Sequence, residues 1–467
     1  MARPTGTPDL DPLFAPKSIA VIGASSNPGR LAGRPLQILL QHSYPGPIYP
    51  VNPQRDEVAG LPAYRSIGDV PGPVDVAAVI VPASLVVDVL RECAAAGVRS
   101  AVVFSSGFAE EGKEGRRAEE QISEIARSSG MRVLGPNAEG FFNAVDRVPL
   151  TFSPTVDYER GLIRLWPGNV AVVSQSGGLG FAVFNGGQHV GLGASHVVST
   201  GNEADLGALE IAQWLLEDPT TDVVALLVEG FRDDEDLAPV ARRAGQLGKT
   251  LIVAKLGRSA AGTEAAAAHT AHRAGDDNEY QQAFVRHGVV RVYDQEDLLD
   301  ACFALSRPYR PAGRRVGILT TSGGAGVWLA DACDAAGLIV PELDAELQAE
   351  LRPFMPSYGS PRNPVDVTAE VVNRAGVAKP LERLIASPQV DTVVWIGSLA
   401  APQTLEREGD ELRRVVASTT KPILVYSYTI PGPASVEALA DLGLPWYPSP
   451  GRAARAARAL VEAGARG

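Results

Sequence analysis

The sequence predicts an α/β protein built from three doubly wound parallel sheets. Short uninterrupted apolar runs recur along the chain, and most of them end near Gly or Ser: SIAVIGA, VDVAAVIVPA, SAVVFSSG, VAVVSQSGG, DVVALLVEG, TLIVAKLG, RVGILTTSGG, DTVVWIGS and KPILVYSYT. Runs of this kind are typical of strands that are buried on both faces of a parallel sheet. Amphipathic stretches such as ASLVVDVLRECAAAG and AEEQISEIARSSG lie between them and end in glycine, as helices often do. The alternation predicts repeated βαβ units.

Two interruptions divide this pattern into three units. The first is an irregular stretch rich in proline and aromatic residues at about 148–168, and the second is a basic, proline-rich link at 306–315. We therefore expect domains at residues 1–147, 148–308 and 309–467. A chain of 467 residues fits this division, because a domain usually takes ~100–200 residues. The Ala/Arg-rich end of the chain predicts a last helix.

Composition restricts the classes of function. The net charge of −12 argues against nucleic acid or a membrane surface as partner, because both attract a basic face. The 3 cysteines are far apart, which favours neither a disulfide framework nor a metal site. The N-terminus has no signal-peptide pattern, and the apolar runs are much shorter than the ~20 residues that cross a bilayer. These features lead us to expect a soluble cytoplasmic protein.

The first unit begins with a strand, a polar loop and a helix start, SIAVIGASSNPGRLAG. Free backbone N–H groups in such a loop can hold a phosphate group. The candidate binding residues of this loop are Gly23, Ala24, Ser25, Asn27 and Arg30. The loop has one glycine at the turn instead of the G-x-G-x-x-G pattern of dinucleotide-binding folds, so NAD is disfavoured. A nicotinamide-dependent oxidoreductase remains an alternative.

Four further loops of this unit carry polar or turn-forming residues: YPVNP, VPA, SSGF and GPN. We expect them at the carboxyl ends of strands, where open α/β sheets bind their ligands. Arg55, just beyond YPVNP, is a candidate for a phosphate contact, because a guanidinium group matches phosphate oxygens. The other candidates in these loops are Asn52, Pro53, Pro82 and Ser105, whereas Asn137 is a candidate for binding phosphate or substrate.

The second unit contains the candidate for covalent chemistry, His269, which we expect in a Gly/Ala/Ser loop after the strand TLIVAKLG. A neutral imidazole can carry a phosphoryl group if an acceptor, usually a carboxylate, holds its other nitrogen. Glu229 ends the strand DVVALLVEG and is the candidate acceptor. The phosphoryl group would need a cradle of amides, for which a helix N-terminus is suited. The candidates for that cradle are Ser174, Gln175, Ser176 and Gly177 of SQSGG, with Gly201 and Asn202 of STGNE.

Taken together, these motifs resemble the NDP-forming acyl-CoA synthetases, and the chain resembles their α-type subunit, related to the α subunit of succinyl-CoA synthetase. The order GAS, YPVNP, VPA, SSGF, GPN matches that family's CoA-binding domain, and KLGRSAAGTEAAAAHT matches its phosphohistidine segment. The resemblance implies a Rossmann-like CoA-binding domain followed by two flavodoxin-like domains. It also implies that His269 is phosphorylated, that Glu229 orients it, and that the loops of the first unit bind CoA.

The chain departs from the family pattern at several positions. Ala138 stands where the family usually has Cys or Ser, and Thr321 replaces the asparagine of TNSGG. After His269 the family usually reads Thr-Gly-Ala-Leu-Ala-Gly, whereas this chain reads Thr-Ala-His-Arg-Ala-Gly. Arg273 therefore adds a cation close to the expected phosphoryl group, whereas His272 does not occupy the family's histidine position. The departure leaves the nucleophile in place but puts the substrate range or the rate in doubt.

The chain has no recognisable ATP-grasp segment and no GxxxxGK[ST] loop. The resemblance therefore implies that Mg-ATP binds to an ATP-grasp β-type partner subunit, in an oligomer. The expected function is an ADP-forming acid:CoA ligase that converts a small carboxylic acid and CoA into an acyl-CoA. The main alternative is a regulatory module that binds CoA or acyl-CoA without catalysis, which the altered AHTAHRAG segment favours.

Overall fold

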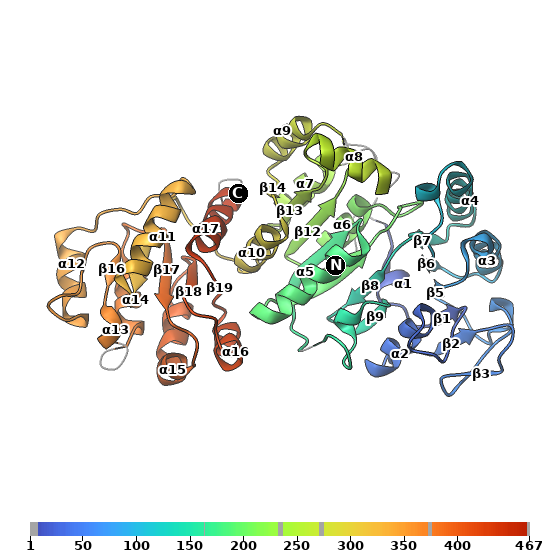
Figure 1. The fold of residues 1–467 in the computed structure, drawn as a ribbon, viewed down its shortest axis with the longest axis horizontal. Helices are drawn as coiled ribbons and strands as arrows, with labels where there is room; N and C mark the ends of the chain where they lie inside the picture. The colour runs from blue at the N-terminus through green and yellow to red at the C-terminus, as the bar shows by residue number, and fades with distance from the viewer. Residues whose placement is uncertain (1–7, 163, 232–236, 270–274, 372–375, 465–467) are drawn as a thin grey trace. The chain divides into compact units, whose positions relative to one another are not determined.

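The protein is described from a computed structural model, which covers residues 8–162, 164–231, 237–269, 275–371 and 376–464. Residues 1–188 together with 193–291 form one compact unit, and residues 189–192 together with 292–467 form a second (Figure 1). The described residues contain three large sheets, two in the first unit and one in the second. The architecture is the α/β class that the sequence predicts.

The first sheet has the strand order β2-β1-β5-β6-β7, and all its neighbouring strands are parallel. Its strands are β1 (Ile19–Ile22), β2 (Ile48–Val51), β5 (Val76–Val79), β6 (Ser100–Val103) and β7 (Arg132–Leu134). One face packs on α3 (Ala83–Ala95) and α4 (Lys113–Ser129), the other on α1 (Asp11–Phe14) and α2 (Arg34–Gln41). A small hairpin, β3 (Glu57–Val58) and β4 (Leu61–Pro62), follows β2.

The second sheet has the order β14-β13-β12-β10-β11-β8-β9. Its parallel strands are β10 (Pro167–Ser174), β11 (Ala194–Ser199), β12 (Val223–Val228) and β13 (Thr250–Lys255), with β14 (Val290–Val292) at one edge. Helix α5 (Gly177–Val190) packs on one face. The other face packs on α6 (Ala208–Glu217), α7 (Leu237–Gln246) and α9 (Asp277–His287). That second face shares a continuous apolar core with the α1 and α2 side of the first sheet.

The stretch at 148–168, expected to be irregular, is partly strand. Strand β9 (Val148–Thr151) pairs antiparallel with β8 (Gly140–Asn143), and β8 pairs antiparallel with β11. Pro149 is tolerated because β9 lies at the edge of the sheet, where one side of the strand needs no ladder hydrogen bonds. Residues before position 148 thus already belong to the second sheet.

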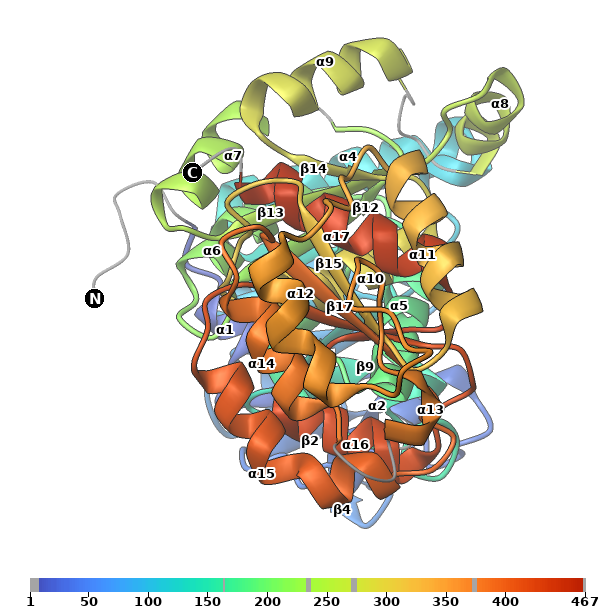
Figure 2. The ribbon, with the colours of Figure 1, turned by 90° about the vertical axis from the view of Figure 1, so that its left-hand side faces the viewer.

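The sheet of the second unit has the order β16-β15-β17-β18-β19 and is parallel. Its strands are β15 (Val316–Thr320), β16 (Val365–Asp366), β17 (Thr392–Gly397), β18 (Ile423–Ser427) and β19 (Trp446–Tyr447). Helices α11 (Gly323–Ala335) and α17 (Pro450–Gly464) pack together, and α10 (Gln295–Leu305) packs on α17. A second group joins α14 (Ala378–Ala386) to α12 (Ala345–Leu351) and α15 (Gln403–Ala417), which contacts α16 (Pro433–Leu442) (Figure 2). A short helix, α13 (Thr368–Val371), follows β16.

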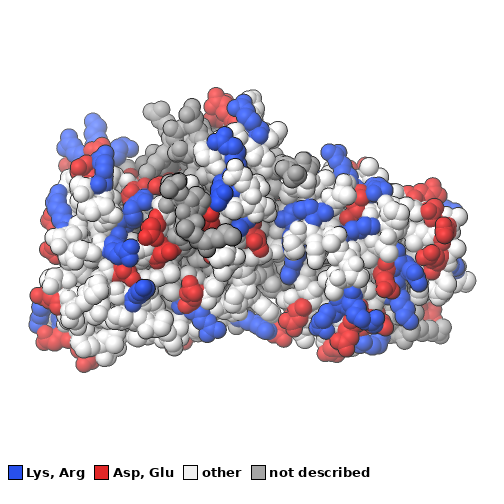
Figure 3. Space-filling view, turned by 180° about the vertical axis from the view of Figure 1, so that it is seen from behind, with Lys and Arg blue, Asp and Glu red and all other residues white. Residues whose placement is uncertain are grey.

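The surface drawn in Figure 3 has mixed charge, and the cysteines are buried. Basic and acidic side chains are interspersed over the face drawn in Figure 3. Cys93, Cys302 and Cys333 are free and buried. Within the described residues, no helix is long and apolar enough to cross a membrane. The described residues contain no group of three or more His, Cys, Asp or Glu side chains that could hold a metal ion.

Candidate functional site

The parallel strands of the second sheet bring three predicted segments to one edge. Ser174 pairs with Leu227, and Val228 pairs with Lys255, so that β10, β12 and β13 end at nearly the same level. The residues that follow these strands begin at Gln175, Glu229 and Leu256. Carboxyl ends of parallel strands are the usual ligand-binding edge of such a sheet.

Gln175 ties two of these strand ends together. Its side-chain Oε1 accepts hydrogen bonds from the backbone N–H of Glu229 at 2.7 Å and of Gly230 at 3.4 Å. Its Nε2 donates to the Gly230 carbonyl at 2.8 Å. Gln175 and Glu229 are 4% and 5% exposed. The sequence placed Gln175 among the residues that cradle a phosphoryl group, and the structure adds that its amide fixes the backbone of Glu229.

The polar turn after β10 leads directly into α5. The Ser174 hydroxyl is buried and donates to the Ser176 carbonyl at 2.6 Å. Helix α5 begins at Gly177, as the SQSGG motif predicted, so its unpaired first-turn N–H groups lie at this edge. Gly180 allows the helix to approach closely, because a Cβ built on it would lie 2.9 Å from the Ser174 Cβ.

Glu139 is a residue of this region that the sequence analysis missed. A Cβ built on Gly177 would lie 3.2 Å from Glu139 Oε2, which places this carboxyl group at the amino end of α5. Glu139 is 9% exposed, and burial raises the pKa of its carboxyl group. No Lys, Arg or His among the described residues forms an ion pair with it. A charged residue just before the apolar strand GFFN is the sequence signal that could have identified it.

His269 is the last residue of helix α8 (Ala260–His269), whereas the sequence led us to expect a loop. The four alanines before it explain the difference, because alanine has the highest helix propensity. Ser259 begins the helix, since its Oγ accepts from the Gly262 N–H at 3.1 Å. The His269 side chain and residues 270–274, with His272 and Arg273, lie outside the described part of the chain. The pairing of His269 with Glu229 therefore stays a prediction.

The GNE loop joins the two sheets of the first unit. Asn202 Nδ2 donates to Glu110 Oε2 at 2.6 Å and to Glu119 Oε2 at 3.1 Å, and its Oδ1 accepts from Asn137 Nδ2 at 3.3 Å. Gly201 has a φ of +60°, and a Cβ on it would lie 2.2 Å from the Pro136 carbonyl oxygen. The structure thus brings Asn137, Gly201 and Asn202 together, and the contacts of Asn202 hold the junction. Their expected role toward phosphate stays a prediction.

The loops expected to bind CoA meet at the carboxyl edge of the first sheet. Gly23 has a φ of +86°, and a Cβ there would lie 2.4 Å from the Ile80 carbonyl oxygen, so the turn requires glycine. Asn52 Nδ2 donates to the Ala24 carbonyl at 2.9 Å, which links the loop after β2 to the loop after β1. Asn27 Oδ1 accepts from Gly29 N–H, and Ser25 Oγ accepts from Asn27 N–H.

The remaining candidates differ in exposure. Ser105 is half-buried and donates to the Val81 carbonyl at 2.5 Å. The others are exposed: Arg30, Pro53, Arg55 and Pro82. The structure therefore brings the predicted loops to one edge of the sheet, and contacts of the exposed side chains with a ligand stay a prediction.

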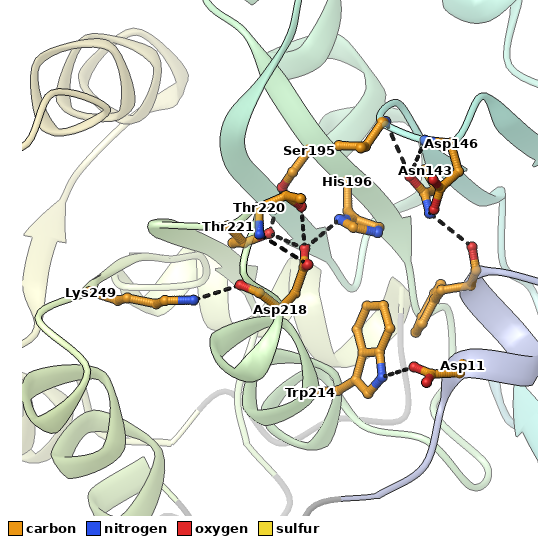
Figure 4. A network of polar contacts seen from close by, with 12 residues as sticks. Asp11, Asn143, Asp146, Ser195, His196, Trp214, Asp218, Thr220, Thr221 and Lys249 are labelled. Atoms are coloured by element: carbon orange, nitrogen blue, oxygen red, sulfur yellow. Dashed lines mark hydrogen bonds and ion pairs between the residues drawn. The ribbon is translucent and has the colours of Figure 1, made fainter. Parts of the chain in front are cut away.

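Two other histidines, His42 and His196, have packing roles. His42 is 6% exposed, and its Nε2 lies 2.8 Å from the Val156 carbonyl. His196 on β11 is 3% exposed and lies edge-on to Phe14 and Trp214. Figure 4 shows His196 directed toward Asp218, with Nδ1 and Oδ2 3.7 Å apart. Burial lowers the pKa of His196 to about 4, against the smaller opposing effect of Asp218.

Three family domains match the chain in the order of its sheets. They are a CoA-binding domain at residues 17–143, a succinyl-CoA ligase-like flavodoxin domain at 167–305, and a ligase-CoA domain at 316–388. The α subunits of the ADP-forming acetate–CoA ligases I and II of Pyrococcus furiosus are 35% and 34% identical to this chain. Each match covers 97% of both proteins.

Solved structures agree with these matches. The ADP- and phosphate-bound acetyl-coenzyme A synthetase 1 of Ca. Korarchaeum cryptofilum, described as dinucleotide forming, has a TM-score of 0.85 at 34% identity. That match covers 98% of this chain and 97% of the other. The protein PH0766 of Pyrococcus horikoshii has a TM-score of 0.84 at 33% identity, over 98% of this chain and 99% of its own. The chain thus belongs to the ADP-forming acyl-CoA synthetase family, as an α-type member related to succinyl-CoA ligase.

Proposed function

We propose that this chain is the α-type subunit of an ADP-forming acid:CoA ligase, which makes an acyl-CoA from a carboxylic acid, CoA and ATP. The observation that carries the proposal is the end-to-end match to ligase α subunits, at 35% identity over 97% of both chains. The matched CoA-binding domain supports CoA in preference to NAD as the ligand of the first sheet.

In the proposed reaction, a nitrogen of the His269 imidazole attacks the γ-phosphorus of ATP, and ADP leaves. A carboxylate oxygen of the acid then takes the phosphoryl group from His269, which gives an acyl phosphate and restores the imidazole. The CoA thiolate finally attacks the acyl carbon, and inorganic phosphate leaves. Dividing the reaction in this way replaces one difficult displacement with several easier ones.

The geometry around Glu229 supports its proposed role as the residue that orients His269. Its backbone is fixed at the carboxyl edge of the sheet by the Gln175 amide. A carboxylate held there can accept a hydrogen bond from one imidazole nitrogen and favour the positive charge that develops as the other is phosphorylated. The amino end of α5, with Ser176 and Gly177, is the proposed cradle for the phosphoryl group.

We also propose that a second subunit, of the ATP-grasp type, supplies the Mg-ATP site. The alpha subunits of the two Pyrococcus furiosus acetate–CoA ligases match this chain over 97% of their length, whereas two acetate–CoA ligases whose names give no subunit are covered only to 54% and 49%. We propose that the partner corresponds to the part of those longer relatives that this chain does not match. The free, buried cysteines are compatible with a reducing cytoplasm, where we place the reaction.

Reconstitution tests this proposal. The full chain is mixed with an ATP-grasp β-type subunit, CoA, Mg-ATP and a panel of small carboxylic acids, and the nucleotide and acyl-CoA products are separated by chromatography. We expect acyl-CoA and ADP in equal amounts, and neither product when this chain is left out. Formation of AMP in place of ADP, or CoA binding without turnover for every acid, would favour the non-catalytic CoA-binding module.

A further inference from the structure

The second compact unit contains a cavity of about 210 Å³. Its walls come from the end of α10 and the turn that follows, the ends of α15 and α16, the segments that lead into β18 and β19, and α17. Ile423 is the first residue of β18, and Pro445 immediately precedes β19. The cavity therefore lies at the amino ends of the strands, at the edge opposite to the one where α/β sheets usually bind substrates.

The walls are largely apolar, and one cation in them, Arg307, has no ion-pair partner among the described residues. Side chains such as Ala304, Leu444 and Leu460 form the apolar surface. Arg307 also lines the cavity, and its Nε is buried without a hydrogen-bond partner. None of the described residues forms an ion pair with its guanidinium group. Burial lowers the pKa of Arg307, as expected of a desolvated cation without a carboxylate beside it.

The neighbouring cations differ from Arg307 because the fold uses them. Lys421 Nζ donates to the carbonyls of Ile385 at 2.9 Å and Ser387 at 2.6 Å. Arg310 donates to the Leu305 carbonyl at 3.2 Å and closes the end of α10. Within the described part of the chain, the Arg307 side chain donates no such hydrogen bond, and an uncompensated buried charge is costly.

Helix α16 ends beside Arg307 without satisfying it. A Cβ built on Gly443, the residue after the helix, would lie 3.2 Å from Arg307 Nη1. The negative end of the helix dipole favours a cation there. However, two carbonyls of the helix's last turn, those of Leu439 and Ala440, accept from the N–H groups of Leu444 and Gly443. The guanidinium hydrogen-bond donors thus remain available to a ligand.

We infer that this cavity binds a small organic acid, with its carboxylate on the Arg307 guanidinium group and its apolar body against the surrounding side chains. A guanidinium group matches a carboxylate through two parallel hydrogen bonds. The volume suits such a ligand, because an apolar cavity of roughly 150 Å³ already accommodates benzene. A phosphate or nucleotide would need more donors than one arginine in an apolar wall.

The test uses the full chain and benzoate as the probe, by isothermal titration calorimetry without CoA or nucleotide. The neutral isostere benzamide and inorganic phosphate are titrated in parallel. The variants are Arg307→Met, Val416→Phe, which fills the cavity from its half-buried rim, and Arg413→Met as the control. Arg413 is an exposed arginine of the same unit, paired with Asp410.

We expect one benzoate per chain, with binding weakened roughly 10- to 100-fold by Arg307→Met, abolished by Val416→Phe and unchanged by Arg413→Met. Benzamide should bind at least about tenfold more weakly than benzoate. Equal binding of benzoate and benzamide, preference for phosphate, or benzoate binding that survives both pocket variants would overturn the inference. If the wild-type chain binds no benzoate at benzoate concentrations up to about 10 mM, the inference is overturned as well.

Discussion

At the scale of single residues, the candidate site rests on side chains that fix one another. Gln175 illustrates this, because one amide group holds the backbone of both Glu229 and Gly230. The sequence predicted that polar residues would follow β10 and β12, since the apolar runs in VAVVSQSGG and DVVALLVEG are followed directly by polar residues. It could not predict the bond between them, because that depends on strand order and register.

Replacing Gln175 by methionine should destabilise the protein and slow phosphorylation. The change keeps the shape of the side chain but leaves the Glu229 N–H and the Gly230 carbonyl unpaired, at roughly 1–3 kcal/mol for each buried group. Thermal unfolding and the rate of phosphoryl labelling measure the two effects. Gln188→Met is the matched control on α5, because Gln188 is also buried and donates to the Thr155 carbonyl at 3.3 Å. Equal loss of labelling rate in both variants would argue against a positioning role for Gln175.

Glu139→Gln should make the protein more tolerant of high pH. Burial raises the pKa of the Glu139 carboxyl group above its ordinary value of 4.5, so the folded protein holds this proton more tightly than the unfolded chain does. The contribution to stability is present below pH 4.5 and is lost as pH rises through the higher folded pKa. Melting temperatures at pH 4.5 and pH 8 should therefore differ less for Glu139→Gln than for the wild type. A variant with the same pH dependence as the wild type would refute this assignment.

At the scale of elements, the strands with continuous apolar runs could be predicted from the sequence, whereas some other strands and one helix could not. All the apolar runs identified from the sequence are strands, because continuous burial on both faces leaves a clear pattern. Strand β9 escaped detection because it contains Pro149, which a strand tolerates at the edge of a sheet. The helix that ends at His269 escaped because the Gly, Ala and Ser residues after the strand TLIVAKLG were interpreted as a loop, whereas the alanine run favours a helix. Glu139 was missed because its environment depends on α5, which is distant in sequence.

The junction of β11 with α6 should unfold more easily in acid because of His196. Its folded pKa of about 4 lies below the ordinary 6.5, so its contribution is present above pH 6.5 and is lost as pH falls toward 4. The full effect is about 3 kcal/mol. His196→Leu should flatten the decline of melting temperature between these pH values.

Ser195→Ala is the control for His196→Leu. It removes the neighbouring hydroxyl group, which lies 2.7 Å from Thr221 Oγ1, but leaves the imidazole in place. This control should keep the decline of the wild type. An unchanged decline in His196→Leu would show that another group causes it.

At the scale of the whole molecule, the three family domains match successive segments of the chain, and this match assigns the chain to its family.

CoA should stabilise the isolated chain, because a ligand at 100 times its Kd adds ~2.7 kcal/mol to the native state. Thermal-shift measurements with CoA and NAD compare the two ligands directly. Gly23→Ala should remove most of the CoA effect, since the φ of +86° and the Ile80 carbonyl leave no room for a Cβ. Stabilisation by NAD and not by CoA would support the oxidoreductase alternative.

The most direct test of the phosphohistidine mechanism is phosphoryl labelling of His269. With an ATP-grasp partner and γ-labelled ATP, the wild-type chain should take up an acid-labile, base-stable label, as expected of a phosphoramidate. His269→Ala should abolish the label, and His272→Ala should retain most of it. Glu229→Gln should slow labelling by roughly 10²- to 10⁴-fold, the range typical of positioned acid–base partners. Normal labelling of His269→Ala would contradict the phosphohistidine mechanism.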